Sequence, residues 1–203
     1  MKYQEIEVKF YLEHLDRLRA HLIEIGAELV QPRTHEINLR FDTPSEELSR
    51  SYRVLRLRQD TDARMTYKGP GELIEGTRLR QEIEFVVSNF QAARAFLEAL
   101  GFQVRMVYEK YRTVYDLDQV HVTLDEMPYG EFCELEGETP QHIINLSQRL
   151  GLNWERRVLD SYTVLFDRLK QSRGLTMRDL TFENFNELNI QPDMLSVQAG
   201  DSP

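Results

Sequence analysis

EIEVKF, residues 5–10, alternates strictly between charged and apolar side chains. This two-residue period predicts a β-strand, because successive side chains of a strand point to opposite faces. One face is apolar, and the other carries two carboxylates and an ammonium: Glu5, Glu7 and Lys9. The question is whether this second face is a solvated surface or a set of ligands.

Similar alternation recurs along the chain and predicts strands at 2–11, 34–43, 52–60, 63–69, 77–87, 103–116, 119–127 and 131–137. Apolar residues at helical spacing predict helices at 13–25, 90–100, 140–150 and 160–173, the second of them capped by Ser88 or Asn89. Many strands with a few helices between them predict an α+β protein. We expect an eight-stranded antiparallel β-barrel with helices packed on its outside.

The polar faces of these strands carry clusters of one sign. Acidic pairs stand at 5/7, 82/84 and 134/136, and basic pairs at 56/58 and 110/112. For any one strand a solvated face is the ordinary explanation. Like charges on one strand face repel, however, so stability alone does not favour this sorting. It becomes favourable if a divalent metal ion lies between the acids and a phosphate between the bases.

The composition narrows the classes of function. A formal net charge of −9 argues against a non-specific nucleic-acid binder. The single cysteine, Cys133, excludes an intrachain disulfide, and its place on an apolar face predicts a core residue. No apolar run approaches the ~18 residues of a membrane span. Because the first ten residues show no signal-peptide pattern, we expect a cytoplasmic protein without a membrane partner.

An ordered series of motifs extends the pattern of EIEVKF. They are LRFDTP (39–44), LRLR (55–58), TYKGP (66–70), RQEIEF (80–85), EKYR (109–112), TLDEMPYGEFCELEG (123–137) and DSY (160–162). With these motifs the chain resembles the CYTH superfamily, also called triphosphate tunnel metalloenzymes, over about residues 2–170. The resemblance implies a tunnel domain at 1–173. Residues 174–203 are then a C-terminal extension, which we expect to be partly helical with a loose end.

The resemblance also implies roles for the charged residues. The metal-binding acids would be Glu5, Glu7, Asp125, Glu134 and Glu136, with Mg²⁺ or Mn²⁺ as the cofactor. The triphosphate-binding bases would be Lys9, Arg56, Arg58, Lys68, Arg80, Lys110 and Arg112. Glu82 and Glu84 match an acidic pair that holds a second metal, orients water or positions the bases, and with Lys9 they are the candidate catalytic residues. Arg40 shares the same face but stays outside this set. A further base from the C-terminal helix would be Arg156, Arg157 or Lys170.

Three functions follow from the resemblance. The first is a metal-dependent triphosphatase acting on inorganic triphosphate, ATP or a similar small molecule. The second is a class IV adenylate cyclase, in which the ribose 3′-oxygen replaces water as the nucleophile. The third is a polyphosphate-binding module without catalysis. A homodimer is one assembly that the sequence leaves open.

Overall fold

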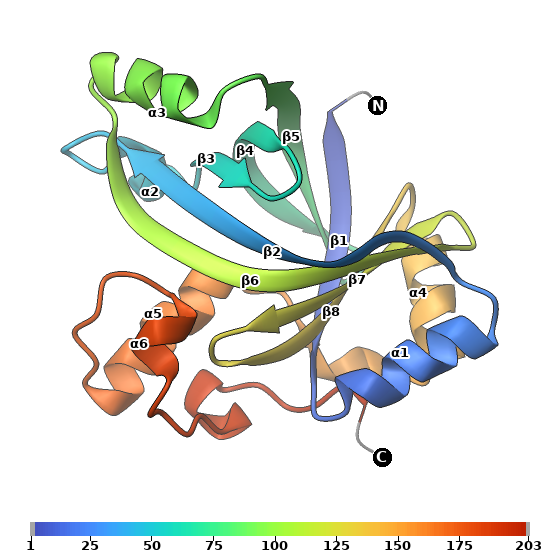
Figure 1. The fold of residues 1–203 in the computed structure, drawn as a ribbon. Helices are drawn as coiled ribbons and strands as arrows, with labels where there is room; N and C mark the ends of the chain where they lie inside the picture. The colour runs from blue at the N-terminus through green and yellow to red at the C-terminus, as the bar shows by residue number, and fades with distance from the viewer. Residues whose placement is uncertain (1–2, 202–203) are drawn as a thin grey trace.

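A computed structural model describes residues 3–201. Eight of its strands form a closed ring, in the order β5-β4-β3-β2-β6-β7-β8-β1, because β1 also pairs with β5 (Figure 1). All neighbours in this ring are antiparallel, as predicted. The strands are β1 (Gln4–Leu12), β2 (Glu28–Asp42), β3 (Val54–Gln59), β4 (Ala63–Ile74), β5 (Thr77–Val87), β6 (Gln103–Leu117), β7 (Val120–Met127) and β8 (Gly130–Gly137). A two-residue strand, β9 (Arg157–Val158), pairs with β1.

The four predicted helices are present. They are α1 (Leu15–Glu24), α3 (Phe90–Ala99), α4 (Pro140–Arg149) and α5 (Tyr162–Arg173). Side chains of Asn89, Thr139 and Ser161 accept backbone N–H groups at the starts of α3, α4 and α5 and so cap them. Shorter helical segments are α2 (Glu47–Arg50), η1 (Trp154–Arg156), α6 (Phe182–Phe185) and η2 (Pro192–Leu195). None of the helices within residues 3–201 is long and apolar enough to cross a membrane.

Two strands are longer than their sequence patterns indicate. β2 begins at Glu28 rather than near residue 34, and its first part pairs with β6 through register shifts around Gln31. β4 continues to Ile74, although GPG at 69–71 reads as the start of a loop. A register shift between Lys68 and Gly71 accommodates Pro70, which has no N–H to donate to a ladder. Pairing with a neighbouring strand therefore overrides the local turn signals.

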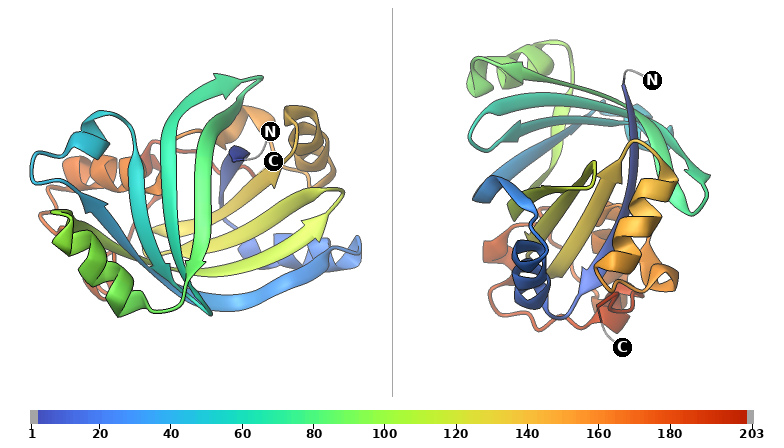
Figure 2. Two further views of the ribbon diagram at one scale, coloured as in Figure 1. Left: turned by 90° about the horizontal axis from the view of Figure 1, so that it is seen from above. Right: turned by 90° about the vertical axis from the view of Figure 1, so that its right-hand side faces the viewer.

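Helices lie on the outside of the sheet (Figure 2), and apolar side chains of the strands pack against them. Val8 and Phe10 of β1 join Cys133 and residues of β7 in a core with α1 and α4. Cys133 is fully buried there, as predicted. A second cluster, around Leu57 and Leu97, lies between α3 and strands β2 to β4. The outer face of the ring is thus the hydrophobic one, and the charged residues are left for the inner face.

Helix α5 packs differently from the other three long helices. Its residues Phe166 and Leu169 share a core with Tyr11, Tyr108 and Phe132. These three aromatic residues lie two positions from charged residues of β1, β6 and β8 and so share the inner face with them. α5 therefore covers part of the charged face itself. This contact brings the first residues of α5 to the candidate site.

The segment after α5 is held in place, contrary to the predicted loose end. Ala199 forms a bridge with Tyr11, and the Asp201 carboxylate accepts the backbone N–H groups of Glu13 and His14. Leu180 and Leu195 are fully buried. The expectation of looseness is wrong for residues up to 201, because scattered leucines in this polar segment reach the aromatic core under α5. Residues 202 and 203 lie outside the described residues, and the domain boundary at 173 stays a prediction.

Candidate active site

The charged side chains meet on the concave side of the ring. Lys68 on β4 contacts Glu5 on β1, although β5 lies between these strands. Arg112 on β6 likewise reaches Glu134 on β8, across β7. On the outer, convex side of a ring, the side chains of non-adjacent strands diverge. Contacts between non-adjacent strands therefore indicate that these side chains point into the interior of the ring. The alternating face first seen in EIEVKF therefore belongs to the charged interior of the ring.

Glu5 is the centre of one cluster. Its oxygens accept hydrogen bonds from Lys68 Nζ at 2.8 and 2.9 Å and from Arg80 Nε at 2.8 Å. Arg80 also reaches Glu7 at 3.0 Å, and Lys68 reaches Glu82 at 3.0 Å. Burial acts to raise the pKa of Glu5, but the charges of Lys68 and Arg80 outweigh it and lower the pKa. Burial and the Glu5 charge raise the pKa of Glu82 to about 7.

Asp125 is the centre of a second cluster and is fully buried. It accepts hydrogen bonds from Lys110 Nζ at 2.9 Å, Arg112 Nε at 2.7 Å and the Tyr162 hydroxyl at 2.8 Å. The Tyr162 ring also lies 5.3 Å from Lys9 Nζ and 5.4 Å from Lys110 Nζ. Burial raises the pKa of Tyr162 well above 10, so the hydroxyl keeps its proton and remains a donor.

Glu36 lies beside this second cluster and is also fully buried. Its carboxylate is 3.6 Å from both Lys110 and Arg58. Burial acts to raise the pKa of Glu36, but Lys110, Arg112 and Arg58 lower it to about 2. Glu36 therefore stays ionised and partly neutralises the basic residues.

Glu84 is shared by the two arginines of β3. It accepts from Arg56 at 3.2 Å and from Arg58 at 3.1 Å, while the Thr66 hydroxyl donates to it at 2.8 Å. Arg56 also donates to the Tyr108 hydroxyl at 3.3 Å. Both guanidinium groups are thus oriented toward the interior before any ligand arrives.

The two acids of β8 differ in how they are paired. Glu134 contacts Arg112 and lies 3.5 Å from Lys9. Glu136 is exposed and directly opposite Glu7 in the β1–β8 register. Although Glu136 keeps contact with solvent, partial desolvation by the surrounding protein and the charges of Glu5 and Glu7 raise its pKa to about 7. Two carboxyl groups face each other here, and of these two only Glu7 has an ion-pair partner within residues 3–201, Arg80.

Comparison with known proteins agrees with this architecture. The CYTH domain family model matches residues 3–146, which is most of the chain. The chain belongs to the CYTH family. The adenylate cyclase CyaB of Aeromonas hydrophila is 27% identical to it over 177 residues, or 81% of this chain and 89% of that protein.

Solved structures share the CYTH fold. A putative adenylate cyclase from Vibrio parahaemolyticus superposes with a TM-score of 0.74 at 22% identity, covering 82% of this chain and 99% of the other. The putative adenylyl cyclase HpAC1 from Hippeastrum, whose structure is described as revealing a dominant triphosphatase activity, gives a TM-score of 0.60 at 17% identity. That match covers 96% of this chain and 100% of HpAC1.

The acids of this CYTH domain fit a divalent cation only in part. Carboxylate oxygens are suitable ligands for Mg²⁺ or Mn²⁺, and the facing pair Glu7 and Glu136 would gain from a cation between them. Asp125 and Glu5 are each held by two bases. Glu7, in comparison, contacts Arg80 alone, and Glu136 forms no ion pair within residues 3–201. Within residues 3–201 no three acidic, histidine or cysteine side chains gather closely enough to form a metal site. The metal therefore stays a prediction, with Glu7 and Glu136 as its best-fitting ligands.

The structure adds residues to the predicted set. Glu36 shares the face of Asn38 and Arg40, so parity along β2 could have identified it. Tyr162 belongs to the DSY motif, but nothing in the sequence places it beside Asp125. The suggested bases of the C-terminal helix do not enter the site: Arg157 donates to backbone carbonyls of Gly76 and Trp154, and Lys170 pairs with Asp167. Arg156 donates to the Ala199 carbonyl.

Proposed function

We propose that this CYTH domain is a divalent-metal-dependent triphosphatase that hydrolyses inorganic triphosphate or a nucleoside triphosphate inside the ring. The observation that carries the proposal is the set of lysines and arginines from five strands that converge on one enclosed face: Lys9, Arg56, Arg58, Lys68, Arg80, Lys110 and Arg112. Arginine forks and lysine ammonium groups are the side chains suited to phosphate oxygens. A chain of phosphates carries enough charge to replace several carboxylates at once.

The ion pairs explain how the site can be ready for an anion without unfolding. Each base now contacts an acid, so the guanidinium and ammonium groups are already oriented. When the triphosphate enters, its oxygens take over contacts that Glu84, Glu134 and Asp125 share with the bases. The bases then neutralise the charge that develops on the phosphates as the bond to the leaving oxygen breaks.

The remaining roles belong to the acids. Glu7 and Glu136 would hold the Mg²⁺ or Mn²⁺, which supplies a Lewis acid for the phosphate oxygens. Glu82, which contacts Lys68, would accept the proton of the attacking water through a carboxylate oxygen. The oxygen of that water bonds to the phosphorus, the bond to the bridging oxygen breaks, and a shortened polyphosphate and orthophosphate leave.

Adenylate cyclase is the second candidate, and the 27% identity with CyaB over 81% of the chain favours it. In that reaction the ribose 3′-oxygen attacks the α-phosphorus, and pyrophosphate leaves. The same bases would hold the three phosphates. The two reactions differ in which phosphorus faces the nucleophile, so the charged residues support both.

Product analysis separates the candidates. Inorganic triphosphate and ATP are each incubated with Mg²⁺ or Mn²⁺, and orthophosphate, pyrophosphate and cyclic AMP are measured. Orthophosphate release as the main reaction supports the triphosphatase. Cyclic AMP with pyrophosphate at a rate comparable to orthophosphate release would overturn it in favour of the cyclase. Tight triphosphate binding without turnover under either metal would indicate a binding module.

A further inference from the structure

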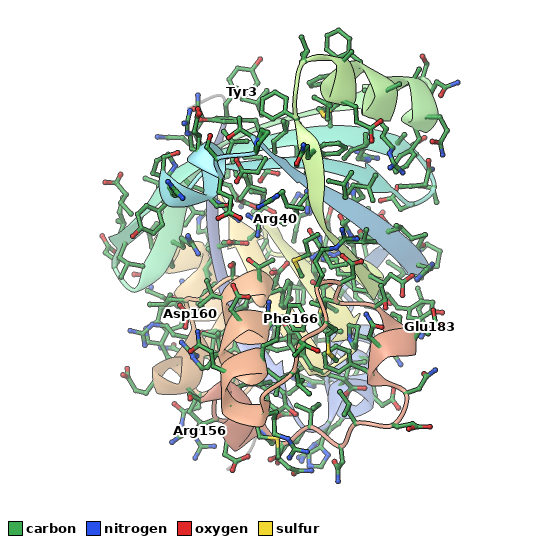
Figure 3. All side chains as sticks on the ribbon, turned by 90° about the vertical axis from the view of Figure 1, so that its left-hand side faces the viewer. Tyr3, Arg40, Arg156, Asp160, Phe166 and Glu183 are labelled. Atoms are coloured by element: carbon green, nitrogen blue, oxygen red, sulfur yellow. The ribbon has the colours of Figure 1, made fainter. Side chains whose placement is uncertain are left out.

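Arg40 on β2 is a base of the inner face that the resemblance leaves without a role. Its guanidinium donates to the Thr163 hydroxyl of α5 at 2.7 Å, and in Figure 3 it lies above α5. Within residues 3–201 it forms no ion pair with a carboxylate. Burial lowers the pKa of Arg40, as does the charge of nearby Arg56.

Asp42 and Asp167 stabilise this charge only from a distance, without a direct ion pair. Asp42 uses its oxygens for the N–H groups of Thr43, Leu48 and Ser49 and for the Ser49 hydroxyl. Asp167 pairs with Lys170 at 2.8 Å. Arg40 therefore differs from Arg56 and Arg58, which both have Glu84 as a partner.

Arg40 and Arg56 are direct register partners on the adjacent strands β2 and β3. Like charges opposite each other in a sheet are destabilising, so this pair is unfavourable as it stands. An anion between them would reverse the sign of the interaction. The Tyr108 hydroxyl accepts from Arg56, which leaves its own O–H as a donor for the same anion. Burial acts to raise the pKa of Tyr108, but the charges of Arg56 and Lys110 lower it.

We propose that Arg40, Arg56 and Tyr108 form an anion subsite, next to α5, that holds a phosphoryl group of a linear polyphosphate chain. The inference rests on the proposed function and adds β2 to the strands that supply phosphate-binding bases. Arg40 has no carboxylate as an ion-pair partner within residues 3–201, so none of its ion pairs is broken when the phosphate binds. Its contact is therefore gained without the loss of an existing ion pair, unlike the contacts of the other inner-face bases.

Calorimetric titration with inorganic triphosphate, in EDTA and without metal, tests the subsite in the full chain. Arg40→Gln removes the charge but keeps a donor for Thr163, and Arg40→Met removes both. Because a hydrogen bond to a charged group contributes about 1.5–3 kcal/mol, both variants should weaken triphosphate binding about 10- to 100-fold. Thr163→Val keeps the charge and should bind within about threefold of wild type. Arg94→Gln, which removes an exposed arginine from α3, is the matched control and should bind like wild type.

The variants also separate this role from a structural one. If Arg40 only anchors α5, Thr163→Val and Arg40→Met weaken binding equally while Arg40→Gln binds like wild type, and the proposal is overturned. Arg40→Gln remains informative should Arg40→Met fail to fold. If Arg40→Gln and wild type bind triphosphate with equal affinity, the subsite is refuted but the proposed function is not. Wild type that binds no triphosphate in EDTA also overturns the metal-free subsite. Wild type that binds none when the titration is repeated with Mg²⁺ or Mn²⁺ refutes the proposed function as well.

Discussion

Asp125→Asn tests whether Asp125 organises the bases or serves mainly as a metal ligand. The carboxylate is fully buried and accepts from Lys110, Arg112 and Tyr162. The amide has the same shape but no charge, so two buried cations lose their main partner. Breaking a buried ion pair by removing one partner costs about 3–5 kcal/mol. In a domain of about 200 residues each kcal/mol shifts the Tm by roughly 2–4 °C, so we expect the Tm to fall by roughly 6–20 °C.

Thermal unfolding in EDTA at neutral pH measures this shift. Glu136→Gln is the control, because Glu136 has no ion-pair partner within residues 3–201 and faces Glu7. Its Tm should stay within roughly 2–4 °C of wild type, the equivalent of about 1 kcal/mol, or rise. Inorganic triphosphate should raise the Tm of Asp125→Asn more than that of wild type, since it returns negative charge to Lys110 and Arg112. An Asp125→Asn Tm equal to that of wild type in EDTA would refute the reasoning and favour a role confined to metal binding.

Three further predictions concern single residues. Arg56→Ala should raise KM and lower kcat for triphosphate, with kcat/KM reduced on the order of 10²-fold or more, because a positive charge facing the phosphates is lost; steady-state kinetics with an unchanged kcat/KM would contradict this. Tyr162→Phe removes the hydrogen bond to Asp125 but keeps the ring, so it should cost about 1 kcal/mol in urea unfolding, and Tyr162→Ala should cost more. Burial acts to raise the pKa of Asp42, but hydrogen bonds from Ser49 and the backbone hold it below 3.8. A carboxyl group whose pKa is lower in the folded state stabilises the fold at pH values above its unfolded-state pKa. This stabilisation is lost as the pH falls through the folded-state pKa. The difference in the free energy of unfolding between wild type and Asp42→Ala should therefore be largest at pH 7 and decrease below about pH 4. A difference that does not change with pH would argue against an ionised Asp42.

Short-range sequence patterns determined the strands of this protein and the division of each strand into a charged and an apolar face. The alternation in EIEVKF and its counterparts identified the strands, and it separated the charged face from the apolar one before any contact was known. Parity also assigned Cys133 to the core, where it is fully buried. These features are readable because side-chain direction in a strand depends only on the residue's position along it. The cap at Asn89 is readable for the same local reason.

Contacts between distant segments were decided only by the tertiary structure. The sequence groups Glu5, Glu7 and Asp125 as acids of one kind, yet Asp125 is enclosed by Lys110, Arg112 and Tyr162 while Glu7 faces Glu136. The reason is the closure of the ring through β1 and β5, which sets the depth and the neighbours of every inner side chain. Local periodicity carries no information on such distances.

The C-terminal segment shows the same limit. Its few buried leucines are too sparse to give a period, so the sequence suggests an extension with a loose end. In the structure this segment packs beneath α5, and α5 brings Tyr162 and Thr163 to Asp125 and Arg40. The sequence by itself determined which faces are charged and where the helices begin. The closure of the sheet and the packing of α5 decided which side chains meet, because contacts such as Lys68–Glu5, Tyr162–Asp125 and Arg40–Thr163 join residues more than 30 positions apart.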